Sequence, residues 1–188
     1  MTDDQSLVQA VLAGKPQAFA RLIDRHQKLV WHVLMRMLGQ REDAEDLAQE
    51  VFLRVHRVLP QFRFESSLAT WIGQIAFSMA TRHLQKKRLP FVDLAGEDGD
   101  SDWCERVSDG FDLEAALADA ELAEHLRREL DALPALQRTL ITLYHQDELG
   151  IGEIAGIVAM PEGTVKNYLF RARQRLRRAL EVKLGVAA

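Results

Sequence analysis

The sequence predicts an all-α protein made of two small helical domains joined by an acidic linker. Apolar residues recur at helical spacings of three and four on both sides of the middle of the chain, and strand-like alternation is hard to find. The middle itself has weak periodicity and contains Gly96, Gly99 and Gly110 among many carboxylates, as linkers often do. We therefore expect a first domain at residues 1–90, a linker at 91–119 and a second domain at 120–188.

The first domain begins with two expected helices. Apolar residues between positions 7 and 23 can line one face of the first helix, and those between 29 and 38 can line the second. Gly39 follows directly and is a suitable residue for the end of a helix.

A third helix is expected to begin near Asp43. It would face the core with a stripe at spacings of four, four and three residues, formed by Leu47, Val51, Val55 and Val58. After Pro60, a short aromatic-rich loop at residues 62–67 precedes a fourth helix at about 69–87, which ends in several basic side chains.

The second domain has the pattern of a helix-turn-helix unit. Leucines from position 122 to 133 form the first helix, and a second follows Pro134. Two more helices are expected at residues 151–160 and 161–183, separated by a very short connection. Pro161 suits the first position of a helix because its missing N–H would be unpaired there.

Charge is distributed unevenly along the chain, whose formal net charge is -4. Residues 1–90 carry 13 Lys/Arg and 9 Asp/Glu, residues 91–131 carry 3 and 14, and residues 132–188 carry 8 and 5. Two mildly basic blocks therefore flank an acidic one, as expected for separate DNA-contacting faces. Two solvated helical surfaces joined by a polar tether would give the same totals.

The last helix has the clearest candidate for a binding surface. Val165, Leu169 and Leu176 fall on one narrow face, and the other side carries residue types that read base edges or pair with phosphates: Lys166, Asn167, Phe170, Arg171, Arg173 and Gln174. In a helix-turn-helix protein, the second helix of the motif enters the major groove. An ordinary amphipathic helix with a basic C-terminal end is the alternative.

Two further surfaces are candidates in the first domain. Asp46, Gln49 and Glu50 form an exposed patch, and its like charges destabilise an isolated helix slightly. Such a patch either docks on a basic partner or is simply a solvated face of the helix. Aromatic residues near cations, at positions 62–64 and at Trp71, suit unpaired bases, which stack on aromatic rings. Trp71 could equally be a core residue.

The sequence lacks the motifs that characterise several other classes of function. The single cysteine, Cys104, cannot form an internal disulfide or a CxxC pair, and glycine-loop, Gly-x-Ser-x-Gly and His-Glu-x-x-His motifs are missing. No apolar run approaches the ~18 residues of a membrane span. We therefore expect a soluble cytoplasmic protein without enzyme activity, metal, cofactor or membrane insertion.

Several short motifs of this sequence resemble those of the extracytoplasmic-function (ECF) sigma factors of bacteria. The segment DAEDLAQEVF at residues 43–52 resembles the polymerase-binding helix of the family's region 2. The segments LGIGEIA at 149–155, PEGTVK at 161–166 and FRAR at 170–173 resemble its region 4 helix-turn-helix. With FR at 62–63 and TWI at 70–72, the resemblance spans about residues 5–88 and 120–182.

The resemblance implies a factor that binds RNA polymerase core, recognises the −35 and −10 promoter elements and helps to melt the promoter. The clamp helices of the largest polymerase subunit would contact Asp43, Asp46, Gln49, Glu50 and Phe52. The −10 element would be bound by Phe62, Arg63, Phe64, Trp71, Gln74, Ser78 and Arg82. The −35 element would be bound by Lys166, Asn167, Phe170, Arg171, Arg173 and Gln174.

The resemblance also implies further contacts. Region 4 would reach the polymerase flap, the linker would thread toward the RNA exit path, and an anti-sigma factor is a candidate partner. Where the family commonly has Arg, Asn and Asp, this chain has Gln74, Ser78 and Arg82, which leaves its −10 preference open.

Two other classes compete with this interpretation. A two-component or quorum-type regulator also ends in a helix-turn-helix, but its receiver or ligand-binding domain would give the first 90 residues an α/β pattern. A helical protein-interaction module would leave the aromatic loop and the basic face without a purpose. The sigma interpretation requires two compact units that present separate faces, with Lys166 and Arg171 outside any core.

Overall fold

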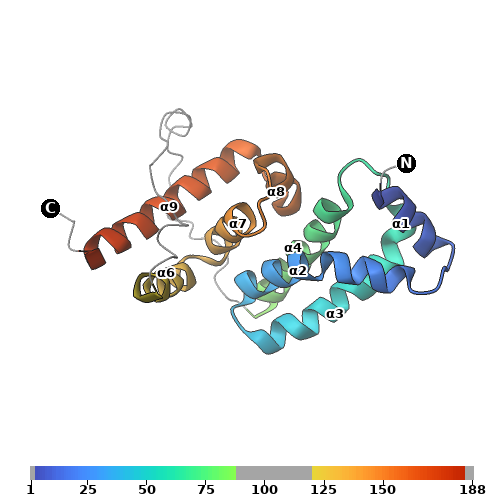
Figure 1. The fold of residues 1–188 in the computed structure, drawn as a ribbon, viewed down its shortest axis with the longest axis horizontal. Coiled ribbons are helices and arrows are strands. Elements are labelled where there is room, and N and C mark those ends of the chain that lie inside the picture. Colours follow the sequence, from blue (N-terminus) through green and yellow to red (C-terminus); the bar gives the residue numbers. More distant parts are fainter. Residues whose placement is uncertain (1–2, 88–119, 185–188) are drawn as a thin grey trace.

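The structure is a computed structural model that describes residues 3–87 and 120–184, all of whose regular elements are helical (Figure 1). The first stretch, called here the first unit, contains α1 (Asp3–Leu12), α2 (Ala18–Leu38), α3 (Arg41–Val58), a 3-10 turn (Leu59–Gln61) and α4 (Leu68–Lys86). The second unit contains α6 (Ala120–Ala132), α7 (Ala135–His145), α8 (Ile151–Val158) and α9 (Glu162–Leu184). The all-α prediction is confirmed. The predicted linker at 91–119 lies outside the described residues.

The predicted division between the first two helices was wrong. The chain breaks after Leu12 rather than after Ile23, and α2 then continues unbroken to Leu38. Gly14 and Gln17 adopt left-handed backbone angles, with φ of 65° and 59°, and neither conformation fits inside a right-handed helix. Pro16 lies between them and has no N–H to donate. This local turn chemistry outweighs the apolar spacing that suggested a single helix from 7 to 23.

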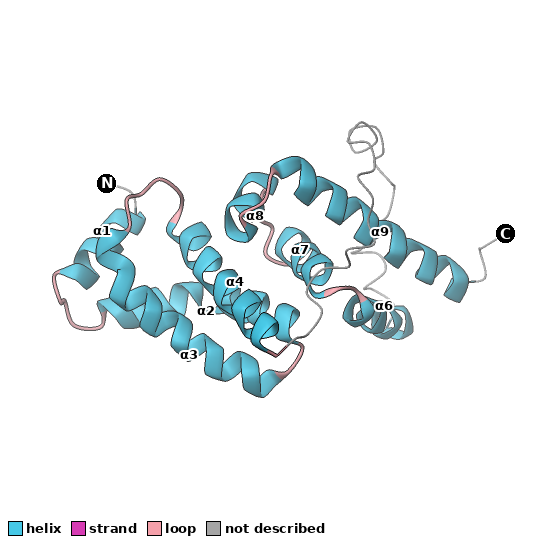
Figure 2. Ribbon diagram, turned by 180° about the vertical axis from the view of Figure 1, so that it is seen from behind, coloured by secondary structure: helices cyan, strands magenta, loops and turns pink. Residues whose placement is uncertain are grey.

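Helix α2 is the centre of the first unit, where it packs against both α3 and α4 (Figure 2). The predicted stripe of α3 faces this core, with Leu47, Val51 and Val55 buried. Gly39 ends α2 in a left-handed conformation, φ 71°, and its N–H donates to the carbonyl oxygen of Met35. The chain can therefore reverse sharply into α3.

Helix α4 begins at a capped N-terminus. The hydroxyl oxygen of Ser67 accepts a hydrogen bond of 3.0 Å from the backbone N–H of Thr70, and the two side-chain oxygens lie 2.8 Å apart. One of the four otherwise unpaired N–H groups of this helix end is thereby satisfied. The cap also holds the end of the aromatic loop next to Trp71.

Replacing Ser67 by alanine is expected to lower the free energy of unfolding by about 1 kcal/mol, because the Thr70 N–H loses its partner. Urea denaturation followed by circular dichroism measures the change. Ser66→Ala is the matched control, since the Ser66 hydroxyl makes only an exposed contact of 3.3 Å with the Ser67 carbonyl. Its effect should stay within about 0.5 kcal/mol. Equal losses in the two variants would show that the cap contributes nothing.

The second unit is built around α7, which packs against α8 and α9. Between α8 and α9 the chain turns through Ala159, which has a left-handed φ of 54°. Pro161 immediately precedes α9, and its carbonyl accepts the first helical hydrogen bond from Val165. The predicted stripe of α9 is buried along its whole length: Val165, Leu169, Ala172, Leu176 and Leu180. The predicted helix-turn-helix is thus present.

The two units are in contact with each other. Helix α2 packs on α7 and α4 packs on α8, so buried apolar residues of both units form one continuous cluster. The sequence predicted two helical units with separate faces, but it did not predict that these units pack on each other. Apolar periodicity marks which face of a helix is buried, but not which helix buries it. Lys166 is nevertheless exposed and Arg171 half-buried, so neither belongs to the shared core.

Candidate protein and nucleic-acid interfaces

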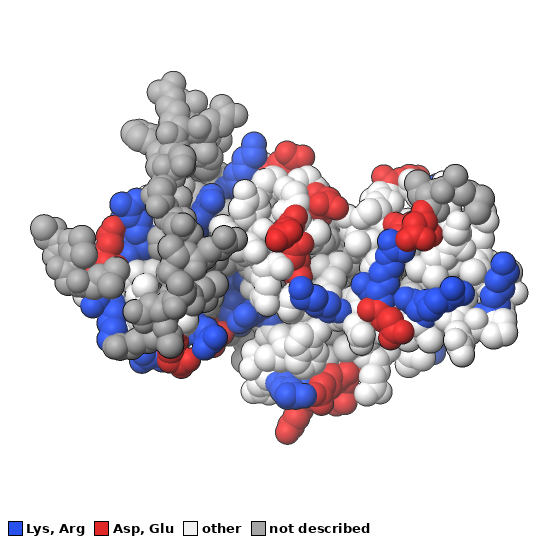
Figure 3. Space-filling model, in the orientation of Figure 1, with Lys and Arg blue, Asp and Glu red and all other residues white. Residues whose placement is uncertain are grey.

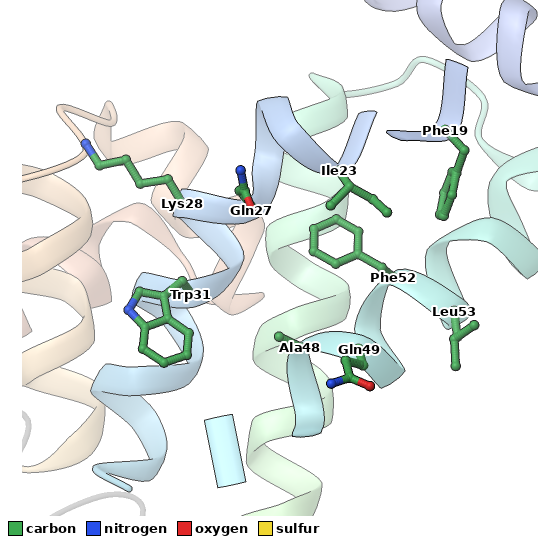
Figure 4. A pocket seen from close by; sticks show the side chains of 9 residues that line it. All are labelled: Phe19, Ile23, Gln27, Lys28, Trp31, Ala48, Gln49, Phe52 and Leu53. Atoms are coloured by element: carbon green, nitrogen blue, oxygen red, sulfur yellow. The ribbon is translucent and has the colours of Figure 1, made fainter. Parts of the chain in front are cut away.

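An open apolar groove lies between α2 and α3 in the first unit (Figure 4). Its cavity volume is about 760 Å³, and its walls include the rings of Phe19, Trp31 and Phe52. Leu53 stands at its edge with 60% of its surface exposed. Solvated apolar surface of this kind favours contact with another macromolecule.

Polar residues of the predicted docking patch border this groove. Asp46, Gln49 and Glu50 are exposed on α3, and Gln49 also lines the groove. With Leu53 they follow spacings of three, one and three residues, so all four lie on one face of the helix. The spacing of Leu53 was a usable signal in the sequence, although Leu53 was not among the predicted docking residues. Trp31, on another helix, carried no such signal.

Two other predicted docking residues are placed differently. Phe52 is buried, with 8% of its surface exposed, so it forms the groove wall rather than a protruding contact. Asp43 accepts a 2.6 Å hydrogen bond from Lys87 and lies 3.7 Å from His83. The Lys87 hydrogen bond holds the pKa of the Asp43 carboxyl below its usual range. Asp43 therefore joins α3 to the end of α4.

An aromatic cluster forms where the loop after α3 meets α4. The ring of Phe62 lies 4.6 Å from that of Phe64 and 5.0 Å from that of Trp71, measured between centroids. Phe62 is buried, whereas Phe64 is 41% exposed and Trp71 half-buried. Phe62 thus supports the two accessible rings. Phe64 has a left-handed φ of 60°, a conformation that loops can hold at binding sites at some cost in backbone energy.

A cavity of about 320 Å³ adjoins this cluster. Arg63, Trp71 and Gln74 line it, and so does Gly156 of the second unit. Trp71, Gln74, Ser78 and Arg82 are spaced by three, four and four residues, which places them along one side of α4. The last three are exposed. The predicted −10 residues of α4 thus lie beside the loop that carries Arg63 and Phe64, whereas Phe62 is buried beneath them.

The candidate DNA face of α9 is only partly solvent-exposed. Lys166 and Gln174 are exposed, and four residues are half-buried: Asn167, Phe170, Arg171 and Arg173. The Arg173 guanidinium lies 5.9 Å from the centroid of the Tyr144 ring, close enough for a cation–π contact that holds it against α7. Figure 3 shows basic side chains along the α9 edge of the second unit and acidic ones near α8.

Within residues 3–87 and 120–184, no group of three or more His, Cys, Asp or Glu side chains could hold a metal ion. Among the helices in the same two ranges, none combines the length and apolar character needed to cross a bilayer.

Comparisons with known proteins match both units. The family model Sigma-70 region 2 matches residues 22–89, and the model Sigma-70, region 4 matches residues 123–176. The ECF RNA polymerase sigma factor SigW of Bacillus subtilis is 32% identical over 92% of this chain and 94% of its own length. The ECF RNA polymerase sigma-E factor of Escherichia coli K12 is 34% identical over 92% of each chain.

A solved structure has a similar fold. The sigma factor RpoE of Bartonella quintana, crystallised in complex with the anti-sigma factor NepR, is 19% identical to this chain. It superposes with a TM-score of 0.59 over 88% of this chain and 98% of its own.

Proposed function

The chain belongs to the ECF sigma factors of RNA polymerase, and from that premise we propose which of its surfaces meets each partner. As a sigma factor it is a non-catalytic subunit that binds RNA polymerase core and promoter DNA and directs promoter-specific transcription initiation. The residue assignments that follow are our inference. The observation that carries them is that three different surfaces, on α3, α4 and α9, have three different chemistries suited to a protein, to unpaired bases and to duplex DNA.

The α2–α3 groove is assigned to the polymerase core. Its apolar floor can bury apolar side chains of the polymerase. Asp46 and Glu50 at its border are complementary in charge to a basic surface, which we expect on the clamp helices. Asp43 and Phe52 have supporting roles, since one ties α3 to α4 and the other forms the groove wall.

The aromatic cluster and the adjoining side of α4 are assigned to the melted −10 element. Phe64 and Trp71 offer accessible rings for stacking, and Arg63 supplies a cation beside them. Gln74 and Ser78 can hydrogen-bond with bases, and Arg82 with phosphate. These residue types differ from the Arg, Asn and Asp that are common in the family. We therefore expect this protein to prefer a −10 base sequence different from that of most family members.

The exposed side of α9 is assigned to the −35 element. Lys166, Asn167 and Arg171 lie in the first half of the helix, the part that enters the major groove in helix-turn-helix proteins. Phe170 can contact a thymine methyl, and Gln174 a base edge or phosphate further along. Arg173 is held against Tyr144 of α7, so we assign it to the border of the DNA-contacting surface.

Arg171→Ala is expected to weaken binding to −35 duplex DNA by about 1–3 kcal/mol, because one cationic base or phosphate contact is lost. Fluorescence anisotropy with a −35 duplex and a scrambled duplex measures the loss and its sequence dependence. Arg178→Ala, which removes an exposed charge two helical turns later, is the matched control and should weaken both duplexes slightly and equally. Unchanged binding by Arg171→Ala would mean that another face reads the DNA.

The location of the protein and its regulation can be inferred from its partners. We place the protein in the cytoplasm, where the polymerase and the chromosome are. We also infer an anti-sigma partner, because the similar sigma factor of Bartonella quintana was solved in complex with one.

Run-off transcription with purified core polymerase tests the whole proposal. Addition of the full chain should give initiation at defined promoters that core polymerase alone does not use. A transcript pattern unchanged by the protein would overturn it.

A further inference from the structure

Helix α1 contacts both ends of the loop at residues 62–67, called here the −10 loop (Figure 1). Just before the loop, α1 packs on the 3-10 turn, Leu59–Gln61. Just after it, the backbone N–H of Leu68, the first residue of α4, donates a hydrogen bond of 3.2 Å to Oδ2 of Asp4. The surfaces assigned above to polymerase and promoter do not include α1, so these contacts call for a role of their own.

Helix α1 is itself fixed to the first unit. It packs on α2, and Val8 is buried in the core. Nη1 of Arg25, on α2, lies 2.6 Å from Oδ2 of Asp3 and 3.8 Å from Oδ1 of Asp4. The Asp3 side chain is 80% exposed and that of Asp4 only 27%. Asp3 therefore meets Arg25 at the surface, whereas Asp4 lies deeper and also accepts from Leu68.

The hydrogen bond from Leu68 satisfies one of the N–H groups that the first turn of a helix leaves unpaired. A carboxylate at this position is also stabilised by the positive end of the helix dipole. Ser67 caps Thr70 from within the loop itself, but Asp4 is 64 positions away in the sequence. The bond of Asp4 therefore fixes the end of the −10 loop relative to the rest of the first unit.

The −10 loop contains backbone that needs such support. Phe64 has a left-handed φ of 60°, which a bulky residue keeps only where the surrounding structure holds it. The buried Leu59 fixes the chain before the loop, and Asp4 and Ser67 fix the chain after it. Trp71 lies in the first turn of α4, so the same anchors set the position of its ring relative to that of Phe64.

We propose that α1 supports the −10 loop and that Asp4 is a positioning residue, whose bond to Leu68 holds Phe64 and Trp71 in place for stacking on unpaired bases. The proposal rests on the assignment of these two rings to the melted −10 element. An ordered loop loses less conformational freedom when it binds. Loss of the bond should therefore weaken promoter opening and leave the polymerase and −35 surfaces unaffected.

Two replacements of Asp4 separate its hydrogen bond from its size. Asp4→Asn keeps an oxygen that can accept from the Leu68 N–H, whereas Asp4→Leu has none. Limited trypsin digestion of the full chain, followed by mass spectrometry, measures the order of the loop through cleavage after the exposed Arg63. This cleavage should be about tenfold faster in Asp4→Leu and within about twofold of the unaltered rate in Asp4→Asn.

Cleavage after Arg54, which lies inside α3, serves as the internal control of the digestion. It requires α3 to unfold and should proceed at the same rate in the unaltered chain and in both Asp4 variants. Asp3→Ala is the matched variant, because it removes the shorter contact of Arg25 and leaves the bond to Leu68 in place. It should leave cleavage after Arg63 unchanged.

The same variants are then assembled with core polymerase on a promoter that run-off transcription has identified. Permanganate reactivity of unpaired thymines should be about tenfold lower for Asp4→Leu, and close to the unaltered level for Asp4→Asn and Asp3→Ala. Affinity for core polymerase and for −35 duplex should stay within about twofold in all three, because α3 and α9 do not depend on the loop.

Equal cleavage after Arg63 in the two Asp4 variants would overturn the proposal, as would normal promoter opening by Asp4→Leu. Parallel increases after Arg63 and Arg54 would also overturn it, because Asp4 would then stabilise the whole unit rather than the loop. Failure of the assigned function is seen separately, as normal opening by a folded variant that lacks both rings. The digestion result does not depend on DNA and would stand in that case.

Discussion

Replacing Asp46 and Glu50 together by lysine is expected to raise the dissociation constant for core polymerase about a thousandfold. Loss of one buried interfacial charge pair costs about 2 kcal/mol or more, and charge reversal adds repulsion against a basic partner. Two such sites give about 4 kcal/mol, which corresponds to that factor. Both side chains are exposed, so helix content by circular dichroism should not change. Competition for core polymerase against a labelled unaltered protein measures the affinity.

A matched variant separates a specific contact from a general effect of charge. Asp24→Lys with Glu65→Lys makes the same change in net charge on exposed positions of the first unit that do not line the α2–α3 groove. It should bind core polymerase within a few-fold of the unaltered protein. If the two double variants bind alike, the border of the α2–α3 groove is not where the polymerase docks.

Replacing both accessible rings, by Phe64→Ala with Trp71→Ala, is expected to make the free energy of promoter opening less favourable by about 2–6 kcal/mol. Stacking of a base on an aromatic side chain contributes about 1–3 kcal/mol, and each ring can take one base. Binding to core polymerase and to −35 duplex should stay close to the unaltered values, because those surfaces lie on α3 and α9. Permanganate reactivity of unpaired thymines in the −10 element measures the opening.

Conservative replacements provide the control for this second prediction. Phe64→Tyr with Trp71→Phe keeps an aromatic ring at each position and should retain most of the opening. Trp71 packs on the buried Phe62, so urea denaturation must show that the alanine variant remains folded. Normal promoter opening by a folded alanine variant would assign the melted strand to a different surface.

Much of the fold could be predicted from the sequence because it depends on local periodicity. The stripes of α3 and α9 are buried as predicted, since a helix of 3.6 residues per turn brings residues three and four apart onto one face. The helix-turn-helix and the family followed from short motifs within single helices and the loops next to them. The division of α1 from α2 was missed, because the left-handed backbone at Gln17 has no signal in apolar spacing.

The candidate site could be predicted only in part, for a related reason. The sequence placed Asp46 and Glu50 on a surface, where the structure exposes them, and left Trp71 open between surface and core, where the structure half-buries it. It did not show that Phe62 and Phe52 are buried supports or that Trp31 shares a groove with Phe52. Burial of an aromatic residue depends on neighbours from other helices, and one sequence does not state which helices those are.

The sequence by itself therefore determined most of the helices, their buried faces and the membership in the ECF sigma factors, because each of these depends on residues within a few turns of one another. Only the tertiary structure decided that region 4 packs on region 2, through Gly73 against Ile157 and His32 against Asp147. Those contacts join residues more than 80 positions apart in the sequence. Their formation depends on the geometry of two surfaces meeting, which no local pattern encodes.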